Sequence, residues 1–169
     1  MIYSLISSID IDIFKKLYDD SIDDFNSGSY PWHLFLPMNE EEKFNHMYEK
    51  AYEILNSPEG IGWLVTNEGF PLMMGFGKRD GDYIKFILGF VGKDSVKSKS
   101  WLYNPQYRIA RETFWSEQNV LGWILVPAST NSAVSNHVQS RLNNYSGSNY
   151  TTEITNVNKL HDNIVVTKS

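Results

Sequence analysis

Apolar residues recur along the chain with either a helical period or a period of two. Near Gly60 the helical spacing gives way to a long stretch of alternation. Before it, residues 2–7 alternate as a short strand, and the apolar positions then repeat at the spacing of an amphipathic helix. Asp10 or Asp12 can accept the unpaired N–H groups at the start of this helix. Its apolar stripe consists of Phe14, Tyr18, Ile22 and Phe25.

A capping box marks the start of a second helix. Asn39 lies three positions before Glu42, so each side chain can accept a backbone N–H group of the other residue. The helix is expected to run to the stop signal at Ser57-Pro58. Its apolar face consists of Phe44, Met47, Tyr48, Ala51, Tyr52 and Leu55.

From Gly60 onward the alternation predicts an antiparallel meander of strands over residues 61–66, 70–78 and 82–91. Asn67-Glu68-Gly69 forms the first turn, and Asp80-Gly81 supplies the positive φ that the second turn requires. In the last of these strands, one face is expected to carry Ile84, Phe86, Leu88 and Phe90.

The rest of the chain predicts a parallel crossover and a closing hairpin. Asn104-Pro105 is typical of an N-cap followed by the first helical residue, and this helix is expected to reach Gln118. A buried strand over 121–126 completes a right-handed βαβ unit. Ser129-Thr130-Asn131 caps a fourth helix, and the last two strands cover residues 150–157 and 163–168.

The predicted order is therefore β-α-α-β-β-β-α-β-α-β-β, an α/β fold of the α+β type with a central mixed sheet flanked by helices. We expect one domain over residues 1–169.

Composition excludes several functional classes. The chain has no cysteine, so thiolate nucleophiles and Cys-ligated metals are excluded, and its four histidines lack metal-ligand spacing. Its 15 Lys and Arg against 20 Asp and Glu predict no dedicated nucleic-acid surface. No apolar run approaches the ~20 residues of a membrane span, and the first residues do not resemble a secretory signal.

Several segments carry a family resemblance together with the element order. These segments are Trp63-Leu64-Val65, Gly69 to Gly75, Phe90 to Asp94, Gly122 to Val126, and Asn131-Ser132. The order resembles that of the GNAT superfamily of acyl-CoA-dependent N-acyltransferases. The segments look like those of the small GNAT-like proteins of podovirus-type phages, which include acetyltransferases and virion-associated proteins.

The resemblance implies that acetyl-CoA or another acyl-CoA binds where the strands ending at Val91 and Val126 separate. Gly89 fits this role, because a residue without Cβ allows close approach to a strand. The family's Q/R-x-x-G-x-G/A motif has no match between Gly92 and Ser100, so the cofactor loop is degenerate. The cofactor-binding residues that the resemblance implies are Leu88, Gly89, Phe90, Val91, Gly92, Lys93, Lys97, Lys99 and Asn131.

Acyl transfer to an amine needs a base for the amine and an acid for the leaving thiolate. The candidate bases are Glu68, Asp82 and Asp94. A carboxylate at a turn or a strand end is more often simply solvated. The candidate acids are Tyr145 and His137, although Tyr145 also falls on the apolar stripe of its helix.

Two hypotheses follow. The first is a phage N-acyltransferase that acts on a small-molecule or protein amine in the host cytoplasm. The second is a catalytically silent GNAT-fold protein of the virion that binds a phage structural protein or a host protein. Aromatic residues in or beside predicted loops favour the second hypothesis as interface anchors. They are Tyr30, Trp32, Phe35, Trp101, Tyr103 and Trp115.

Overall fold

The computed structural model describes residues 1–24, 38–93, 105–125, 150–158 and 161–168. Its strands are β1 (Ile2–Ile6), β2 (Gly60–Asn67), β3 (Phe70–Asp80), β4 (Tyr83–Val91), β5 (Gly122–Leu125), β6 (Tyr150–Asn158) and β7 (His161–Lys168). Its helices are α1 (Ile11–Asp24), α2 (Glu40–Leu55) and α5 (Pro105–Glu117). The predicted fourth helix, the loop before Pro105 and the aromatic connection before Met38 lie outside the described residues.

The described strands form one seven-stranded mixed sheet in the order β1-β2-β3-β4-β5-β7-β6. Strands β4 and β5 run parallel and are joined through α5, while the other neighbouring pairs are antiparallel. This arrangement confirms the predicted meander, the parallel crossover and the closing hairpin. None of the described helices has the length and apolar character needed to cross a membrane.

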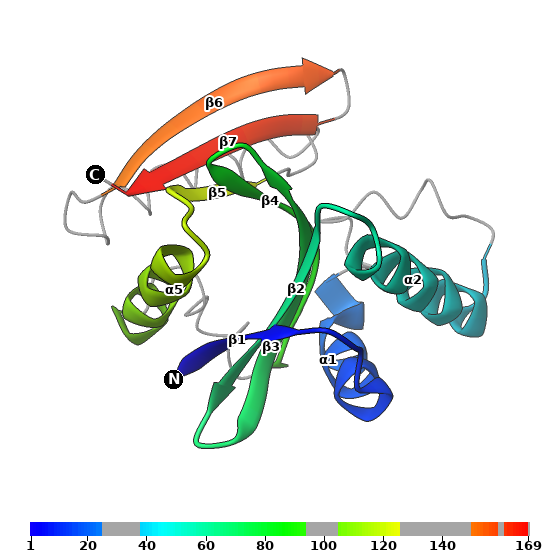
Figure 1. The fold of residues 1–169 in the computed structure, drawn as a ribbon. Coiled ribbons are helices and arrows are strands. Elements are labelled where there is room, and N and C mark those ends of the chain that lie inside the picture. Colours follow the sequence, from blue (N-terminus) through cyan, green and yellow to red (C-terminus); the bar gives the residue numbers. More distant parts are fainter. Residues whose placement is uncertain (25–37, 94–104, 126–149, 159–160, 169) are drawn as a thin grey trace.

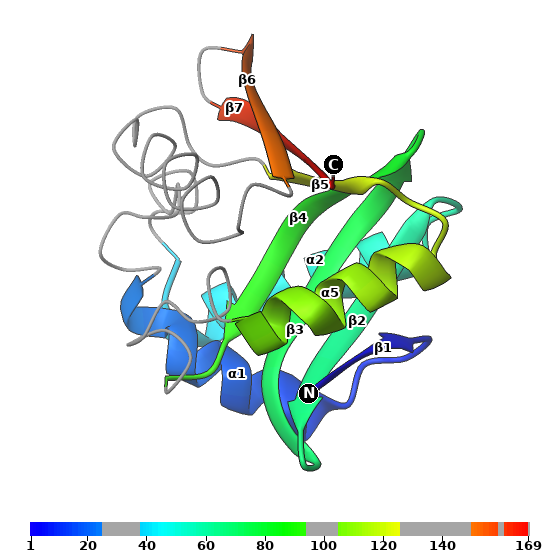
Figure 2. The same cartoon turned by 90° about the vertical axis from the view of Figure 1, so that its left-hand side faces the viewer.

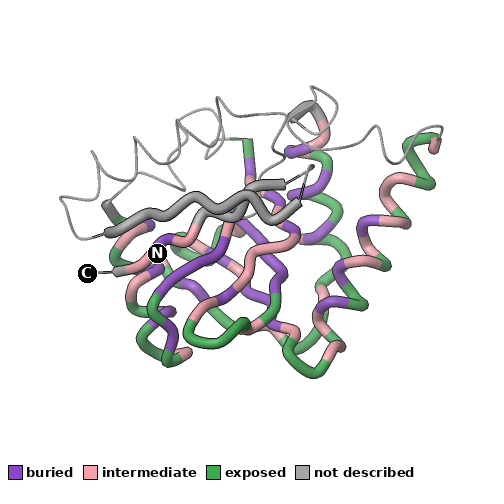
Figure 3. The backbone as a smooth tube through the Cα atoms, turned by 90° about the horizontal axis from the view of Figure 1, so that it is seen from above, coloured by how far each residue is buried: buried purple, intermediate pink, exposed green. Residues whose placement is uncertain are grey.

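Helices cover both faces of the sheet, with α1 and α2 on one face and α5 on the other (Figure 1). Each face has its own hydrophobic core. Phe14 of α1 and Met47 of α2 pack with strand residues such as Phe76 in the first core. Phe114 of α5 packs over Tyr3 and Trp63 in the second. Trp115 was expected beside a loop, but it lies within α5 and is buried in this second core. Buried residues accordingly gather along the central strands between the helix layers (Figure 3).

Local signals placed the starts of α1, α2 and α5 and the two turns of the meander correctly. Asp10, and not Asp12, caps α1, because its Oδ1 accepts the N–H groups of Asp12 and Ile13 at 3.0 and 3.1 Å. The predicted capping box of α2 is present in full. In the β3–β4 turn, Gly81 has a φ of 59° at the first central position, as a type II′ turn requires.

A β-bulge in β4 overturns one prediction. Gly77 pairs with Phe86 and Phe76 pairs with Leu88, so Ile87 is an extra residue on the β4 side. Ile84 and Phe86 therefore face α5, whereas Leu88 and Phe90 face α1 and α2. The prediction that these four side chains share one face was wrong, because an extra residue reverses the alternation of every residue that follows it.

Candidate functional site

The two parallel strands β4 and β5 remain paired over a short distance. Their described pairs are Tyr83 with Gly122, Ile84 with Trp123 and Lys85 with Ile124. Beyond Lys85, β4 continues to Val91 and diverges from β5 (Figure 2). The bulge at Ile87 lies just past the last pair and accounts for the divergence, since bulges bend the strand that carries them. Among the described residues, the second half of β4 therefore has a strand neighbour on its β3 side alone.

Ser21 of α1 binds the end of this β4 edge. Its hydroxyl oxygen accepts the Val91 N–H at 3.0 Å. The same hydroxyl can donate to the Val91 carbonyl at 3.0 Å or to the Leu17 carbonyl at 2.8 Å. The Val91 groups thus point away from β3, whereas the next N–H, of Gly92, donates to Leu72 on β3.

Backbone groups of alternate strand residues point toward the same edge. The N–H and C=O groups of Gly89 therefore point to the same outer edge as those of Val91, while those of Leu88 and Phe90 face β3. Ser21 already occupies the groups of Val91. Among Leu88 to Val91, which were predicted to bind a pantetheine arm through their backbone, Gly89 is therefore the residue whose N–H and C=O groups point to the outer edge without being bound by Ser21.

The space beside Gly89 is filled by an aromatic ring. A Cβ built on Gly89 would lie 2.3 Å from Cζ of Phe86, so the missing side chain makes room for that ring. Phe86 packs in turn on Trp63 and Trp123, with ring centroids 5.3 and 6.0 Å away. These three rings lie on the α5 face where β4 and β5 separate.

Asp20 organises the residues that follow β4. Its Oδ2 accepts the Lys93 N–H at 3.4 Å and forms an ion pair with Lys16 at 3.2 Å. Gly92 is buried and Lys93 is exposed. Lys97, Lys99 and Asn131, which the resemblance assigned to the cofactor, lie outside the described residues.

The structure places two candidate bases at opposite ends of β3. Glu68 lies in the β2–β3 turn and Asp82 in the β3–β4 turn, and β3 spans 11 residues between them. At a rise near 3.3 Å per residue this separates the two turns by about 35 Å, so a single site uses at most one of them. Asp82 lies at the end of β4 that is paired with β5. Asp94, Tyr145 and His137 lie outside the described residues, and their assigned roles stay predictions.

Sequence reasoning missed the residues of α1 that contact this edge. Ser21 lies 70 positions from Val91 in the chain, and a serine in a helix gives no signal of a distant partner. The position of the bulge at Ile87 was also missed, because Phe86, Ile87 and Leu88 are all apolar and the sequence does not show which of them is the extra residue. Within the described ranges, no three His, Cys, Asp or Glu side chains gather in a way that could hold a metal ion.

No protein-family model and no curated protein matches this sequence. Solved structures do match over almost the whole chain. A ribosomal L7/L12 α-N-protein acetyltransferase is 13% identical with a TM-score of 0.58, over 100% of this chain and 91% of its own. An aminoglycoside 6′-N-acetyltransferase complexed with coenzyme A is 12% identical with a TM-score of 0.56, over 99% and 97%.

The GNAT domain of S. lividans PAT is 10% identical with a TM-score of 0.51, over 97% of this chain and 89% of its own. The chain has the GNAT fold. At these identities the likeness concerns the fold alone. Within the GNAT fold of this chain, the separating strands are β4 and β5, and the helix between them is α5.

Proposed function

We propose that this GNAT-fold protein is an acyl-CoA-dependent N-acyltransferase that acts on a primary amine of a small molecule or a protein. The observation that supports the proposal is the separation of β4 from β5 after Lys85, which leaves the Gly89 backbone at an outer edge. The amine nitrogen attacks the thioester carbonyl, the new C–N bond forms and the C–S bond breaks. The amine proton passes to a base, and the thiolate leaves as the free thiol of CoA after protonation.

In this proposal the chain's own groups have separate roles. The Gly89 N–H and C=O pair with amide groups of the pantetheine arm, as an added strand would. Lys93, Lys97 and Lys99 neutralise the phosphates. Asn131 contacts the cofactor through its uncharged amide. Glu68 or Asp94 removes the amine proton, and Tyr145 or His137 protonates the thiolate.

Isothermal titration with acetyl-CoA tests cofactor binding. Changing Lys93, Lys97 and Lys99 together to Gln should weaken binding about tenfold at low salt, because three cations near the phosphates are lost. A matched variant changes Lys15, Lys50 and Lys78 to Gln, which lie outside the segment that follows β4, and its affinity should stay within about twofold of the parent. Equal losses in the two variants would contradict a local phosphate site.

A thiol-release assay tests the reaction itself. With acetyl-CoA and a panel of primary amines, free CoA thiol should appear only when an amine is present. Binding of acetyl-CoA without thiol release would support the cofactor site but contradict acyl transfer. Failure to bind acetyl-CoA at millimolar concentration would contradict both.

The second candidate function is a catalytically silent binding protein of phage origin, located in the virion or the host cytoplasm. The aromatic rings of Phe86, Trp63 and Trp123 support it, because they fill the α5 face where β4 and β5 separate. The resemblance of the quoted segments to phage proteins supports the origin. Detection of the chain in purified particles, together with no acetyl-CoA binding, would favour this function over acyl transfer.

A further inference from the structure

The gap between β4 and β5 closes toward Lys85. Neighbouring backbones in a sheet lie about 4.8 Å apart, and a chain inserted between two strands needs about twice that separation. An extended arm that pairs with Gly89 therefore cannot reach the last β4–β5 pair, which joins Lys85 and Ile124. The inner end of the arm has to stop near the bulge at Ile87, where the strands begin to diverge.

The direction of a pantetheine arm follows from the proposed phosphate contacts, so this inference rests on the proposed function. Lys93 follows the outer end of β4. An arm whose phosphates lie near Lys93 runs inward along β4, past Gly89. The thioester and its acyl group then lie at the inner end of the arm, beside Phe86 and Ile87. A longer acyl chain has to leave the plane of the sheet at this point.

Phe86 closes the α5 face of the sheet beside the gap. Its ring extends along β4 and covers Gly89, where a built Cβ would collide with Cζ and Cε1 of the ring. Trp63 and Trp123 pack against the same ring, with centroids 5.3 and 6.0 Å away. The two indoles also contact each other at 4.8 Å, so the ring of Phe86 has little room to move aside.

The other face of the sheet is closed by the core under α1 and α2. Leu88 and Phe90 are fully buried in that core, together with Phe14 of α1. Phe86 is half-buried, and its ring lies over a part of β4 that has no pairing with β5. Truncation of Phe86 would therefore open space at the gap without disturbing the core under α1 and α2.

We infer that Phe86 restricts the acyl donor to short chains, acetyl or propionyl, by closing the inner end of the β4–β5 gap. Phe86 is then a specificity-determining residue that contacts the acyl group and takes no part in proton transfer. A chain of four or more carbons would have to displace the ring from Gly89 and from the two indoles of Trp63 and Trp123.

Isothermal titration with a series of donors tests the inference without any reaction. The series is CoA, acetyl-CoA, butyryl-CoA and hexanoyl-CoA, which share the phosphates and the arm and differ in the acyl group. The parent protein should bind CoA and acetyl-CoA within about threefold of each other. It should bind hexanoyl-CoA at least about tenfold more weakly, because overfilling a packed region is unfavourable.

Two substitutions of Phe86 should change this order. In Phe86→Ala, hexanoyl-CoA should bind at least as tightly as acetyl-CoA, since each methylene buried in the vacated space favours binding by up to about fourfold. Phe86→Leu removes less volume and so costs less stability. It should accept butyryl-CoA but still discriminate against hexanoyl-CoA.

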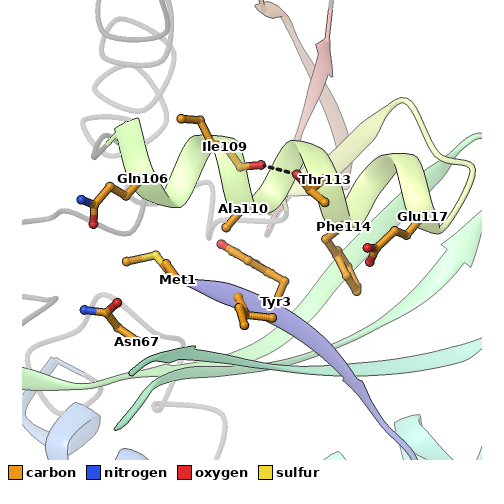
Figure 4. A pocket seen from close by; sticks show the side chains of 10 residues that line it. Met1, Tyr3, Asn67, Gln106, Ile109, Ala110, Thr113, Phe114 and Glu117 are labelled. Carbon is orange, nitrogen blue, oxygen red and sulfur yellow. Dashed lines mark hydrogen bonds between the residues drawn. The ribbon is translucent and has the colours of Figure 1, made fainter. Parts of the chain in front are cut away.

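Phe114→Leu is the matched control. Phe114 belongs to the same core as Phe86, but it lies beside Tyr3 of β1 (Figure 4). Strands β2 and β3 separate β1 from β4. Phe114→Leu loses the same volume of side chain as Phe86→Leu and should keep the parent's order of affinities.

Indole N–H signals in NMR spectra give a second readout that does not depend on affinity. Trp63 and Trp123 contact the ring of Phe86, so an acyl chain that replaces this ring should shift their signals. Hexanoyl-CoA should therefore shift both signals in Phe86→Ala more than CoA does.

The outcomes separate this inference from the proposed function. Equal affinities of the parent for all four donors would overturn the inference and leave the proposed function intact. An unchanged order of affinities in both Phe86 variants, or a gain of hexanoyl-CoA binding in Phe114→Leu, would do the same. Failure of the parent to bind both CoA and acetyl-CoA at millimolar concentration would overturn both.

Discussion

Glu68 holds an unfavourable backbone conformation at the β2–β3 turn. Asn67 pairs with Phe70, so Glu68 and Gly69 are the central residues, with φ values of 50° and 83°. Positive φ at both positions is the type I′ requirement, for which Asn-Gly is preferred. Glu68→Asn should therefore stabilise the protein by about 0.5–1 kcal/mol in urea denaturation. Glu59→Asn, at an exposed site without positive φ, is the control, and an equal gain there would contradict the backbone explanation.

Tyr18 provides the pH-dependent prediction at the residue scale. Burial, and then the carboxylates of Glu40 and Asp19, raise the pKa of Tyr18 to about 12. Between about pH 10 and pH 12 the unfolded chain loses this proton while the folded chain keeps it, so stability falls as pH rises. In this window the parent should lose stability more steeply than Tyr18→Phe, as followed by urea denaturation. Parallel curves for the two proteins would contradict the raised pKa.

At the scale of elements, the capping box fixes where α2 begins. Asn39 Oδ1 accepts the Glu42 N–H at 2.9 Å, and Glu42 Oε2 accepts the Asn39 N–H at 3.2 Å. Asn39→Ala should destabilise the protein by about 1 kcal/mol in urea denaturation, because α2 loses a bond to one of its free N–H groups. Glu49→Ala, an exposed change in the middle of α2, should have little effect. A similar loss of stability in both variants would show that the capping box does not stabilise the protein.

At the scale of the whole molecule, the sheet separates two cores that we expect to unfold together. Phe14 packs on Phe76 and Phe90, whereas Phe114 packs on Tyr3 and Trp63. Phe14→Leu and Phe114→Leu should each cost about 1–2 kcal/mol. The double variant should cost their sum within about 0.5 kcal/mol, because the two sites share no partner.

Far-UV circular dichroism and tryptophan fluorescence should report one common transition in these variants. Trp63, Trp115 and Trp123 lie in the α5-side core, so fluorescence follows that core most directly. Two separate transitions, with Phe14→Leu shifting one of them alone, would contradict cooperative unfolding of the two faces.

The sequence by itself determined the features that depend on neighbouring residues. Asn39 and Glu42 lie three positions apart, and the turn at Gly81 needs a residue that tolerates positive φ. The helix and strand periods then ordered the elements well enough to indicate the GNAT fold. Such signals can be read without a structure, because the interacting groups are close in the chain.

Tertiary structure alone decided how the candidate site is arranged. The bulge at Ile87 depends on the pairing of β4 with β3, and it reverses which side chains face α5. Ser21 reaches Val91 across 70 positions of sequence. The ring of Phe86 fills the space where a Gly89 side chain would lie, while the backbone groups of Gly89 point to the outer edge of β4. Strand register and packing join distant residues, so they are decided only when the whole sheet is assembled.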